Sequence, residues 1–232
     1  CSECELDYEN VGGNCYYVPD MEVVATLFEN SGLPNSYADV IQMGTWVDGR
    51  MEVLRCINCY IYHGPIPEDI GNMTALKKIQ LYGNYLTGDI PASLWTLENL
   101  TVLSLSYNDL TGEIPSDIGN LTNLTELALA GNALSGSIPS EIEHLLNLTN
   151  LTLAYNEFNG IVPESICNLV ENESYINFYG NDLCPPYPAC LEEWHIGYQS
   201  TEECITVCAD ELKEIDGECY DEADLDALQD II

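Results

Sequence analysis

Cysteine is the residue of this sequence whose number and spacing point most clearly to chemistry. There are 11 cysteines among the 232 residues, which suits a protein of an oxidising compartment. Two pairs, Cys1/Cys4 and Cys56/Cys59, also have the C-x-x-C spacing found in zinc sites. Because so many cysteines indicate secretion, we expect disulfides rather than zinc, and the odd total leaves one cysteine over.

The other reactive side chains do not combine into a catalytic site. Carboxylates are so abundant, at 39 Asp and Glu, that pairs arise by chance and none is singled out as a glycosidase pair. His63, His144 and His195 have no metal or triad spacing and are expected at the surface. No glycine-rich phosphate loop follows an expected strand. We therefore expect no enzyme, no cofactor and no metal.

The net charge of −34 argues against several classes of partner. Nucleic acids and anionic lipids are bound through Lys and Arg, and the chain has only 5 of these. No apolar run approaches the roughly 18 residues of a membrane helix. The hydrophobic fraction of 46% is nevertheless enough for a folded core. With no initiator Met or signal peptide, the chain is expected to be a mature or excerpted piece.

A repeat of 24 residues organises the middle of the chain, from Gly64 to Gly160. A hydrophobic residue and a proline follow each repeating glycine, and an asparagine stands four residues before each of the last four. Alternating leucines before the asparagine predict a short strand with one face inward. An apolar i, i+3 pair after each proline, such as Ile118 and Leu121, predicts one helical turn on the opposite side.

The stretch from Leu100 to Pro115, LTVLSLSYNDLTGEIP, resembles the plant-type leucine-rich repeat L-x-x-L-x-L-x-x-N-x-L-x-G-x-I-P throughout. The resemblance covers about residues 51–183. It implies an α/β solenoid, a right-handed superhelix with a parallel sheet on the concave face, short helices on the convex face, and disulfide-rich caps. We expect the repeating asparagines to bond backbone groups of neighbouring coils: Asn84, Asn108, Asn132, Asn156 and Asn181.

The sequence divides into four parts on this interpretation. Residues 1–50 form an N-terminal cap, with a helix over residues 20–28 that Asp20 caps. Residues 51–169 hold five repeats of 24 residues. Residues 170–204 form a cysteine-rich C-terminal cap with a degenerate repeat, in which prolines replace the glycine turn.

The fourth part, the tail of residues 205–232, repeats the head of the chain. Gly217 and Cys219 lie 204 residues after Gly13 and Cys15, and the residues around them match as well. The tail therefore resembles the start of another N-terminal cap, and we expect it to link this module to a following module or a neighbouring molecule. A locally folded tail without a partner is one alternative. A calcium loop is another, although the residues before Gly217 include Lys213, which is no calcium ligand.

The duplicated spacing and the repeat period together suggest how the cysteines pair. A disulfide that closes a loop of the Cys4–Cys15 size stabilises a fold by roughly 3 kcal/mol. The expected pairs are Cys4–Cys15, Cys56–Cys59, Cys167–Cys190, Cys184–Cys204 and Cys208–Cys219. Cys1 remains, either unpaired or bridging to a neighbour. A lipid anchor at Cys1, as in bacterial surface lipoproteins, stays an alternative.

The concave face is the usual binding surface of the family that this sequence resembles. Its outward positions are mostly small and uncharged, which disfavours a deep small-molecule pocket, and tyrosines stand toward both ends. Tyrosine is common at protein interfaces, although these residues could simply face solvent. The residues expected to meet a partner are Lys78, Tyr82, Tyr107, Glu126, Tyr155, Tyr175 and Tyr179.

N-x-S/T sequons mark sites where a glycan can be attached in a suitable host. Most of them arise because the repeat itself contains the tripeptide N-L-T. The candidates for glycosylation are Asn72, Asn99, Asn120, Asn123, Asn147, Asn150 and Asn172.

These features predict an extracellular or cell-surface protein that works by protein contact. The preferred hypothesis is a structural or adhesive module of a head-to-tail array or self-assembling fibre. The alternative is a ligand-recognition module, such as a receptor ectodomain or an inhibitor of a secreted enzyme, that uses the concave face. Self-association would favour the first hypothesis, and a monomer with a foreign ligand the second.

Overall fold

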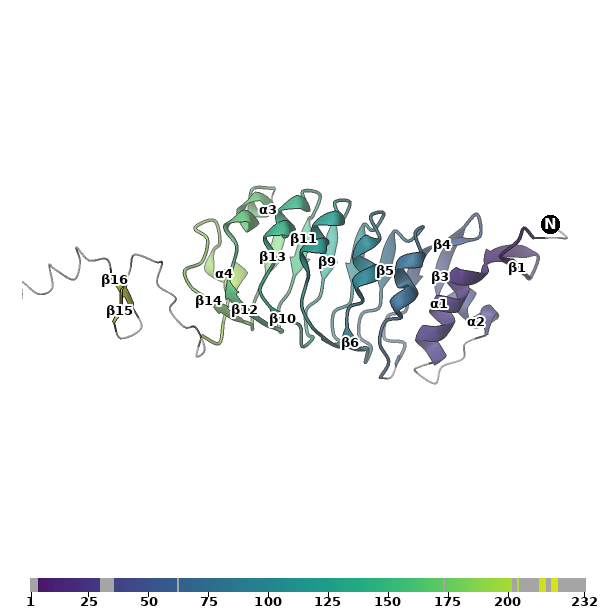
Figure 1. The fold of residues 1–232 in the computed structure, drawn as a ribbon, viewed down its shortest axis with the longest axis horizontal. Coiled ribbons are helices and arrows are strands. Elements are labelled where there is room, and N and C mark those ends of the chain that lie inside the picture. Colours follow the sequence, from purple (N-terminus) through teal and green to yellow (C-terminus); the bar gives the residue numbers. More distant parts are fainter. Residues whose placement is uncertain are drawn as a thin grey trace, which may run out of the picture.

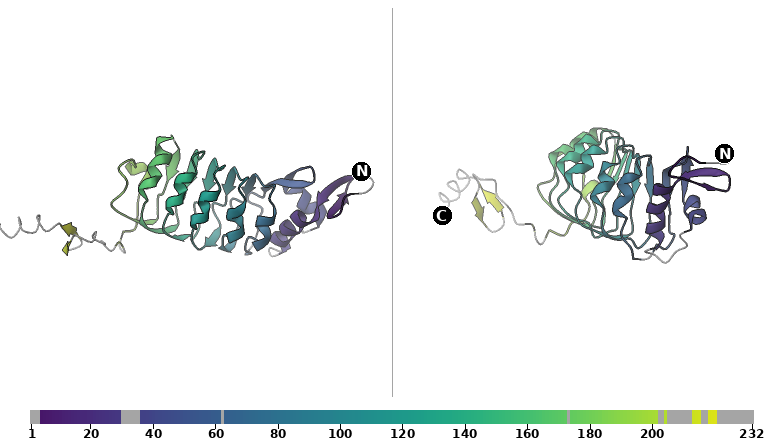
Figure 2. Two further views of the ribbon diagram at one scale, coloured as in Figure 1. Left: turned by 45° about the horizontal axis from the view of Figure 1, so that its top comes forward. Right: turned by 45° about the vertical axis from the view of Figure 1, so that its right-hand side comes forward.

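The chain forms a solenoid of stacked coils with a cap at each end (Figure 1). The structure is a computed structural model, and it describes residues 4–29, 36–61, 63–172, 174–201, 204, 213–215 and 218–220. The two further views in Figure 2 show the strands along one side of the row of coils and the helical turns along the other.

A mainly parallel sheet lines the concave side, in the strand order β13-β11-β9-β7-β5-β4-β3. Its strands are β3 (Gly44–Val47), β4 (Arg50–Arg55), β5 (Lys78–Gln80), β7 (Val102–Ser104), β9 (Glu126–Ala128), β11 (Asn150–Thr152) and β13 (Tyr175–Asn177). Only the pairing of β3 with β4 is antiparallel in this order. The register aligns equivalent positions of successive repeats, so that Leu103, Leu127 and Leu151 lie side by side.

The convex side carries the helical turns that the apolar i, i+3 pairs predict. They are η1 (Glu68–Asn72), η2 (Ala92–Thr96), η3 (Ser116–Asn120), η4 (Ser140–His144) and η5 (Glu164–Ile166), which runs into α3 (Cys167–Glu171). Each η turn is a tight 3-10 helix preceded by the proline of the repeat. Proline suits this place because its fixed φ allows the chain to enter a helical turn.

Between the two sides, a second set of short strands joins the coils in parallel. They are β6 (Thr87–Asp89), β8 (Asp109–Thr111), β10 (Ser135–Gly136), β12 (Glu157–Ile161) and β14 (Asp182–Cys184). The interior that these layers enclose is filled by the repeating apolar side chains. Leu121, Leu124 and Leu127 of one coil are all 0% exposed. Each fully buried leucine contributes roughly 1.5–3 kcal/mol, so stacking supplies the main stabilisation.

The N-terminal cap consists of the hairpin β1 (Tyr8–Val11) and β2 (Asn14–Tyr17), then α1 (Val18–Glu29) and α2 (Tyr37–Gln42). The prediction that Asp20 caps its helix is wrong, because α1 begins at Val18 and Asp20 lies in its first turn, 0% exposed. The Asp20 carboxylate instead points inward and accepts hydrogen bonds from Arg50 (2.9 and 3.1 Å) and from the Met51 amide (3.0 Å). It thereby ties α1 to the first strand of the repeat region.

The C-terminal cap closes the last coil with α4 (Glu193–Ile196). The expectation that every histidine is a surface residue fails here, since His195 is 3% exposed. Its Nδ1 accepts a hydrogen bond from the Glu192 amide at 2.9 Å, and its backbone carbonyl accepts from the Phe178 amide. His195 therefore acts as a structural part of the cap.

Disulfides lie in both caps and in the first coil. The structure joins Cys4 to Cys15, Cys56 to Cys59, Cys167 to Cys190 and Cys184 to Cys204, the same partners that the spacing favours. Cys1 and Cys208 lie outside the described residues, so the structure does not bear on a Cys208–Cys219 bond or on a lipid at Cys1.

The described part of the tail is a hairpin of β15 (Lys213–Ile215) and β16 (Glu218–Tyr220). Its pairing repeats that of the head: Glu214 lies opposite Cys219 as Asn10 lies opposite Cys15. The other pairs of the tail hairpin also keep the offset of the head. The sequence duplication therefore extends to the backbone register.

Candidate contact surface

The concave face is built from two columns of outward side chains held in register across the sheet. One column consists of Val53, Lys78, Val102, Glu126, Asn150 and Tyr175, and the other of Arg55, Gln80, Ser104, Ala128, Thr152 and Asn177. Charged residues among them are confined to Arg55, Lys78 and Glu126. The middle of the face is therefore close to neutral in a chain of net charge −34.

Small side chains form a recessed floor along the middle of this face. Ser104 is 9% exposed, Ala128 7% and Ala154 2%. Strands about 4.8 Å apart bring larger neighbours close enough to cover such short side chains. The small, uncharged outward positions of the sequence thus form a floor that is largely covered, and a partner would meet mainly the larger side chains around it.

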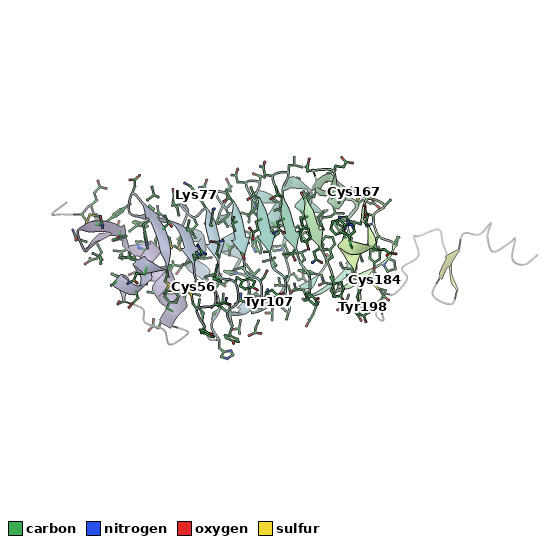
Figure 3. The ribbon with its side chains drawn as sticks, turned by 180° about the vertical axis from the view of Figure 1, so that it is seen from behind. Cys56, Lys77, Tyr107, Cys167, Cys184 and Tyr198 are labelled. Carbon is green, nitrogen blue, oxygen red and sulfur yellow. A yellow bond between two sulfur atoms is a disulfide. The ribbon has the colours of Figure 1, made fainter. Side chains whose placement is uncertain are left out.

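Tyrosines rise above this floor along the edge where the strands end, and we call four of them the tyrosine row: Tyr82, Tyr107, Tyr155 and Tyr179. Tyr107 is 52% exposed and Tyr155 56%. The ring centres of Tyr82 and Tyr107 lie 5.2 Å apart, as do those of Tyr155 and Tyr179. Figure 3 views the sheet side and shows Tyr107 on the edge opposite Lys77.

Tyr107 and Tyr155 adopt a backbone conformation that favours glycine. Their φ angles are 58° and 56°, and Gly131 and Gly180 take the same place in the next coils with φ of 68° and 70°. The left-handed region costs a non-glycine residue roughly 1–2 kcal/mol. Each ring lies directly over the glycine of the next coil, where an added Cβ would come within 3.0 Å of the ring.

Tyr175 begins a second aromatic group at the C-terminal end of the face. Its ring lies 6.2 Å from that of Trp194, nearly parallel to it, and Trp194 in turn stacks on His195 at 3.6 Å. Trp194 is 53% exposed. Sequence reasoning missed Trp194, because it lies in α4, beyond the last repeat, where no periodic pattern assigns it to a face.

The N-terminal end of the solenoid holds the basic side chains of the repeat region. Lys77 pairs with Glu52, with Nζ and Oε1 2.6 Å apart. Arg50 is held by Asp20 and lies over the ring of Tyr17, 4.3 Å from its centre. The hydrogen bonds that Arg50 donates to the Asp20 carboxylate raise the pKa of Arg50. Arg55 and Lys78 are exposed, which gives the concave face a weakly basic end.

The predicted asparagine ladder is made of buried and part-buried hydrogen bonds within and between coils. Asn108 Nδ2 donates to the carbonyls of Leu81 (3.0 Å) and Leu105 (2.9 Å), and its Oδ1 accepts from the Leu86 amide (3.1 Å). Equivalent bonds to two coils are made by Asn84, Asn132, Asn156 and Asn181. These residues hold the turn of each coil and take no part in a binding surface.

A second, exposed ladder runs through three of the sequon asparagines. Asn99, Asn123 and Asn147 donate from Nδ2 to the carbonyls of Thr74, Glu98 and Thr122, at 3.0, 2.8 and 2.9 Å. The threonine of each sequon also donates to a carbonyl of the preceding coil. The recurrence of the N-L-T tripeptide therefore has a structural reason, which the equal spacing of these sequons could have revealed.

Glycan occupancy tests whether the concave face is open. Asn150 lies on β11, half-buried, and its Oδ1 is enclosed without a hydrogen-bond partner among the described residues. A glycan there would stand over the floor and block it. We expect the folded protein from a eukaryotic secretory host to carry glycans at the exposed Asn72 and Asn120 and none at Asn150. Peptide mapping by mass spectrometry checks this, and an occupied Asn150 would contradict an open concave face.

Hollows of the surface lie at the caps. One of about 500 Å³ is lined by Glu22, Thr26 and Asp69, and another of about 810 Å³ by residues of the N-terminal hairpin. Within the described residues, no three His, Cys, Asp or Glu side chains converge as metal ligands would. In the same part of the chain, no helix is long and apolar enough to cross a membrane.

Comparison with known protein families identifies the repeats. The family model described as "Leucine Rich repeats (2 copies)" matches residues 98–142, and that described as "Leucine Rich Repeat" matches residues 75–97 and 147–169. The search of curated proteins found no match to this chain.

Solved structures of plant receptors share the fold. The Arabidopsis receptor kinase HAESA, in complex with the peptide hormone IDA and the co-receptor SERK1, is 34% identical over 68% of this chain and 25% of its own, with a TM-score of 0.56. The ectodomain of the receptor kinase SOBIR1 from Arabidopsis thaliana is 27% identical over 75% of this chain and 98% of its own, with a TM-score of 0.60. The plant peptide hormone receptor RGFR1, in complex with RGF2, is 36% identical over 56% of this chain, with a TM-score of 0.53.

The chain spans a quarter or less of the length of the first receptor structures that it matches, such as 20% of RGFR1 and 25% of HAESA. The matched repeats, their parallel sheet and the disulfides at both ends nevertheless agree. This chain belongs to the plant-type leucine-rich-repeat family with cysteine-rich caps.

Proposed function

We propose that this chain is an extracellular recognition module that binds protein or peptide partners on its concave face. The observation that carries the proposal is the pair Tyr107 and Tyr155, two half-exposed rings that keep an unfavourable backbone conformation over a neutral floor. Neighbouring coils use glycine at this place, so the fold does not require tyrosine there. Unfavourable backbone that is retained at a surface often marks a functional site.

Two further features support the proposal. Rigid tyrosines bury a large area at little cost in conformational entropy, and the exposed rings of Tyr175 and Trp194 extend the same face. Similar repeat arrays were solved in complexes, HAESA with the peptide hormone IDA and the plant peptide hormone receptor RGFR1 with RGF2. The disulfides of the caps suit an extracellular or cell-surface location. Binding, rather than catalysis, is the proposed role.

Selection from a random-peptide display library tests the proposal. The wild-type chain serves as bait, and each enriched peptide is measured again on the Tyr107→Gly/Tyr155→Gly variant and on Tyr85→Ala, a matched exposed tyrosine outside the row. We expect peptides whose binding is lost on the double variant and kept on Tyr85→Ala. Enriched peptides that bind all three baits equally would contradict recognition by this face.

Joining of modules head to tail is a second candidate function, favoured by the hairpin β15–β16. Because this hairpin repeats the register of β1–β2, we propose that residues 205–232 offer a cap element to a following module or a neighbouring molecule. In this proposal residues 1–50, 51–169 and 170–204 form the module, and arrays or fibres form by its repetition.

Sedimentation velocity tests this joining. If the tail joins molecules, the full chain forms species larger than a monomer as its concentration rises, and deletion of residues 205–232 abolishes them. Joining between molecules is contradicted if both chains sediment as monomers at every concentration.

A further inference from the structure

We propose that the tyrosine row binds a proline-rich partner segment in the polyproline II conformation. This inference rests on the proposed function, because it names the class of partner that the concave face takes. The row contains a repetition that the fold itself does not demand.

Tyr107 and Tyr155 are presented to a partner in the same way. They hold the same position in coils two apart, with φ angles of 58° and 56°. The Cδ1 and Cε1 atoms of Tyr107 would lie 3.0 and 3.3 Å from a Cβ on Gly131, and those of Tyr155 would lie 3.0 and 3.4 Å from a Cβ on Gly180. Because adjacent strands are about 4.8 Å apart, equivalent atoms of the two rings are separated by about 10 Å. A straight ligand that makes the same contact with both rings must therefore have a structural repeat of about this distance.

The polyproline II helix has a repeat of this length. It has three residues per turn and a rise of about 3.1 Å per residue, so the same face returns about every 9 Å. Side chains on one face of a β-strand return about every 6.7 Å, which does not fit. An α-helix, with a pitch of about 5.4 Å, would meet both rings on alternate turns. Its carbonyls, however, are already bonded within the helix.

The chemistry of the row also favours this conformation. Polyproline II leaves its carbonyls free of internal hydrogen bonds, so tyrosine hydroxyls at the edge of the face can donate to them. Proline rings pack against aromatic rings, and the preformed helix loses little entropy on binding. The outer rings, Tyr82 and Tyr179, each lie 5.2 Å from an inner ring and widen the platform. The neighbouring residues Ser106, Ala130 and Ala154 add no charge that would select a charged ligand.

Fluorescence anisotropy with two synthetic peptides tests the inference on the full chain. Both peptides are uncharged and have the same length and composition. One has proline at every third position, and in the other the same number of prolines stands at alternate positions of one segment. We expect the first peptide to bind at least tenfold more tightly. Binding should fall at least tenfold on Tyr107→Gly/Tyr155→Gly, which should fold because glycine stands there in neighbouring coils, and should persist on Tyr85→Ala.

The possible results separate the partner classes. The inference is overturned if the two peptides bind equally, if the double variant keeps the first peptide, or if neither peptide binds and an uncharged β-linked oligosaccharide does. Display-selected peptides that need Tyr107 and Tyr155 but lack proline at every third position would overturn it while leaving the proposed function intact. Failure of every displayed peptide to depend on these rings would overturn both.

Discussion

Replacing Asn108 by alanine is expected to lower the free energy of unfolding by about 3–5 kcal/mol, one of the largest effects of any substitution in the repeats. The amide of Asn108 satisfies the Leu81 and Leu105 carbonyls and the Leu86 amide, all in the interior. Alanine has no group that can replace these bonds, and water cannot reach the backbone groups left behind. Urea unfolding checks the loss through the shift of the midpoint at constant slope.

Asn123→Ala is the matched control for this prediction. Asn123 is also a repeating asparagine, but it is exposed and donates to one carbonyl, that of Glu98, at 2.8 Å. Water can replace that bond, so the expected loss is below about 1 kcal/mol. If both variants lost the same free energy of unfolding, the buried ladder would not be the main set of hydrogen bonds that stabilises each turn.

Asp20→Ala is expected to lower the free energy of unfolding by about 2–4 kcal/mol. The carboxylate is 1% exposed and accepts from the Arg50 guanidinium and the Met51 amide. Its removal leaves a charged group without its partner and a buried amide without an acceptor. Because the Arg50 side chain is 26% exposed, water recovers part of this loss, which places the effect below that of a fully buried pair.

The exposed Glu22, on the same helix, supplies the control, and Glu22→Ala is expected to change stability by less than about 0.5 kcal/mol. A Glu22→Ala loss as large as that of Asp20→Ala would contradict this role of Asp20.

The raised pKa of Arg50 also has a consequence for pH. A cation whose pKa is raised by folding contributes stability below its unfolded pKa and loses it only as pH rises through the folded value. The ion pair between Arg50 and Asp20 should therefore persist throughout the mildly alkaline range.

The sequence predicts the repeats well because one physical requirement recurs in every coil. Leucine alternation, the repeating asparagine and the proline before each turn determine the conformation of one coil within 24 residues. Each further coil then adopts the same conformation and stacks on the one before it. The same logic locates Tyr107 and Tyr155 on the concave face. Their left-handed backbone is not evident from sequence, because the pattern allows either glycine or tyrosine at this place.

The caps are harder to predict because each is built once. Asp20 was expected to cap the start of a helix, but α1 already begins at Val18, and the Asp20 carboxylate points toward Arg50, 30 residues away in sequence. His195 and Trp194 similarly depend on how α4 meets the last coil. Contacts of this kind join segments with no shared period, so local patterns carry no information about them.

Tyr107 and Tyr155 are the side chains on which a contact role for the concave face depends most directly. Glycine at both positions removes a backbone cost of roughly 1–2 kcal/mol per residue. It also loses ring contacts worth about 0.5–1.5 kcal/mol each. The two effects nearly cancel, whereas alanine loses the ring and keeps the backbone cost.

Urea unfolding of the Tyr107→Gly/Tyr155→Gly variant, beside the matched double alanine variant, is therefore the most direct measurement. If the rings serve a partner, the double glycine variant stays within about 1 kcal/mol of the wild type and is more stable than the double alanine variant. A loss of several kcal/mol, with glycine no better than alanine, would show that the rings hold the fold together and would contradict the contact role.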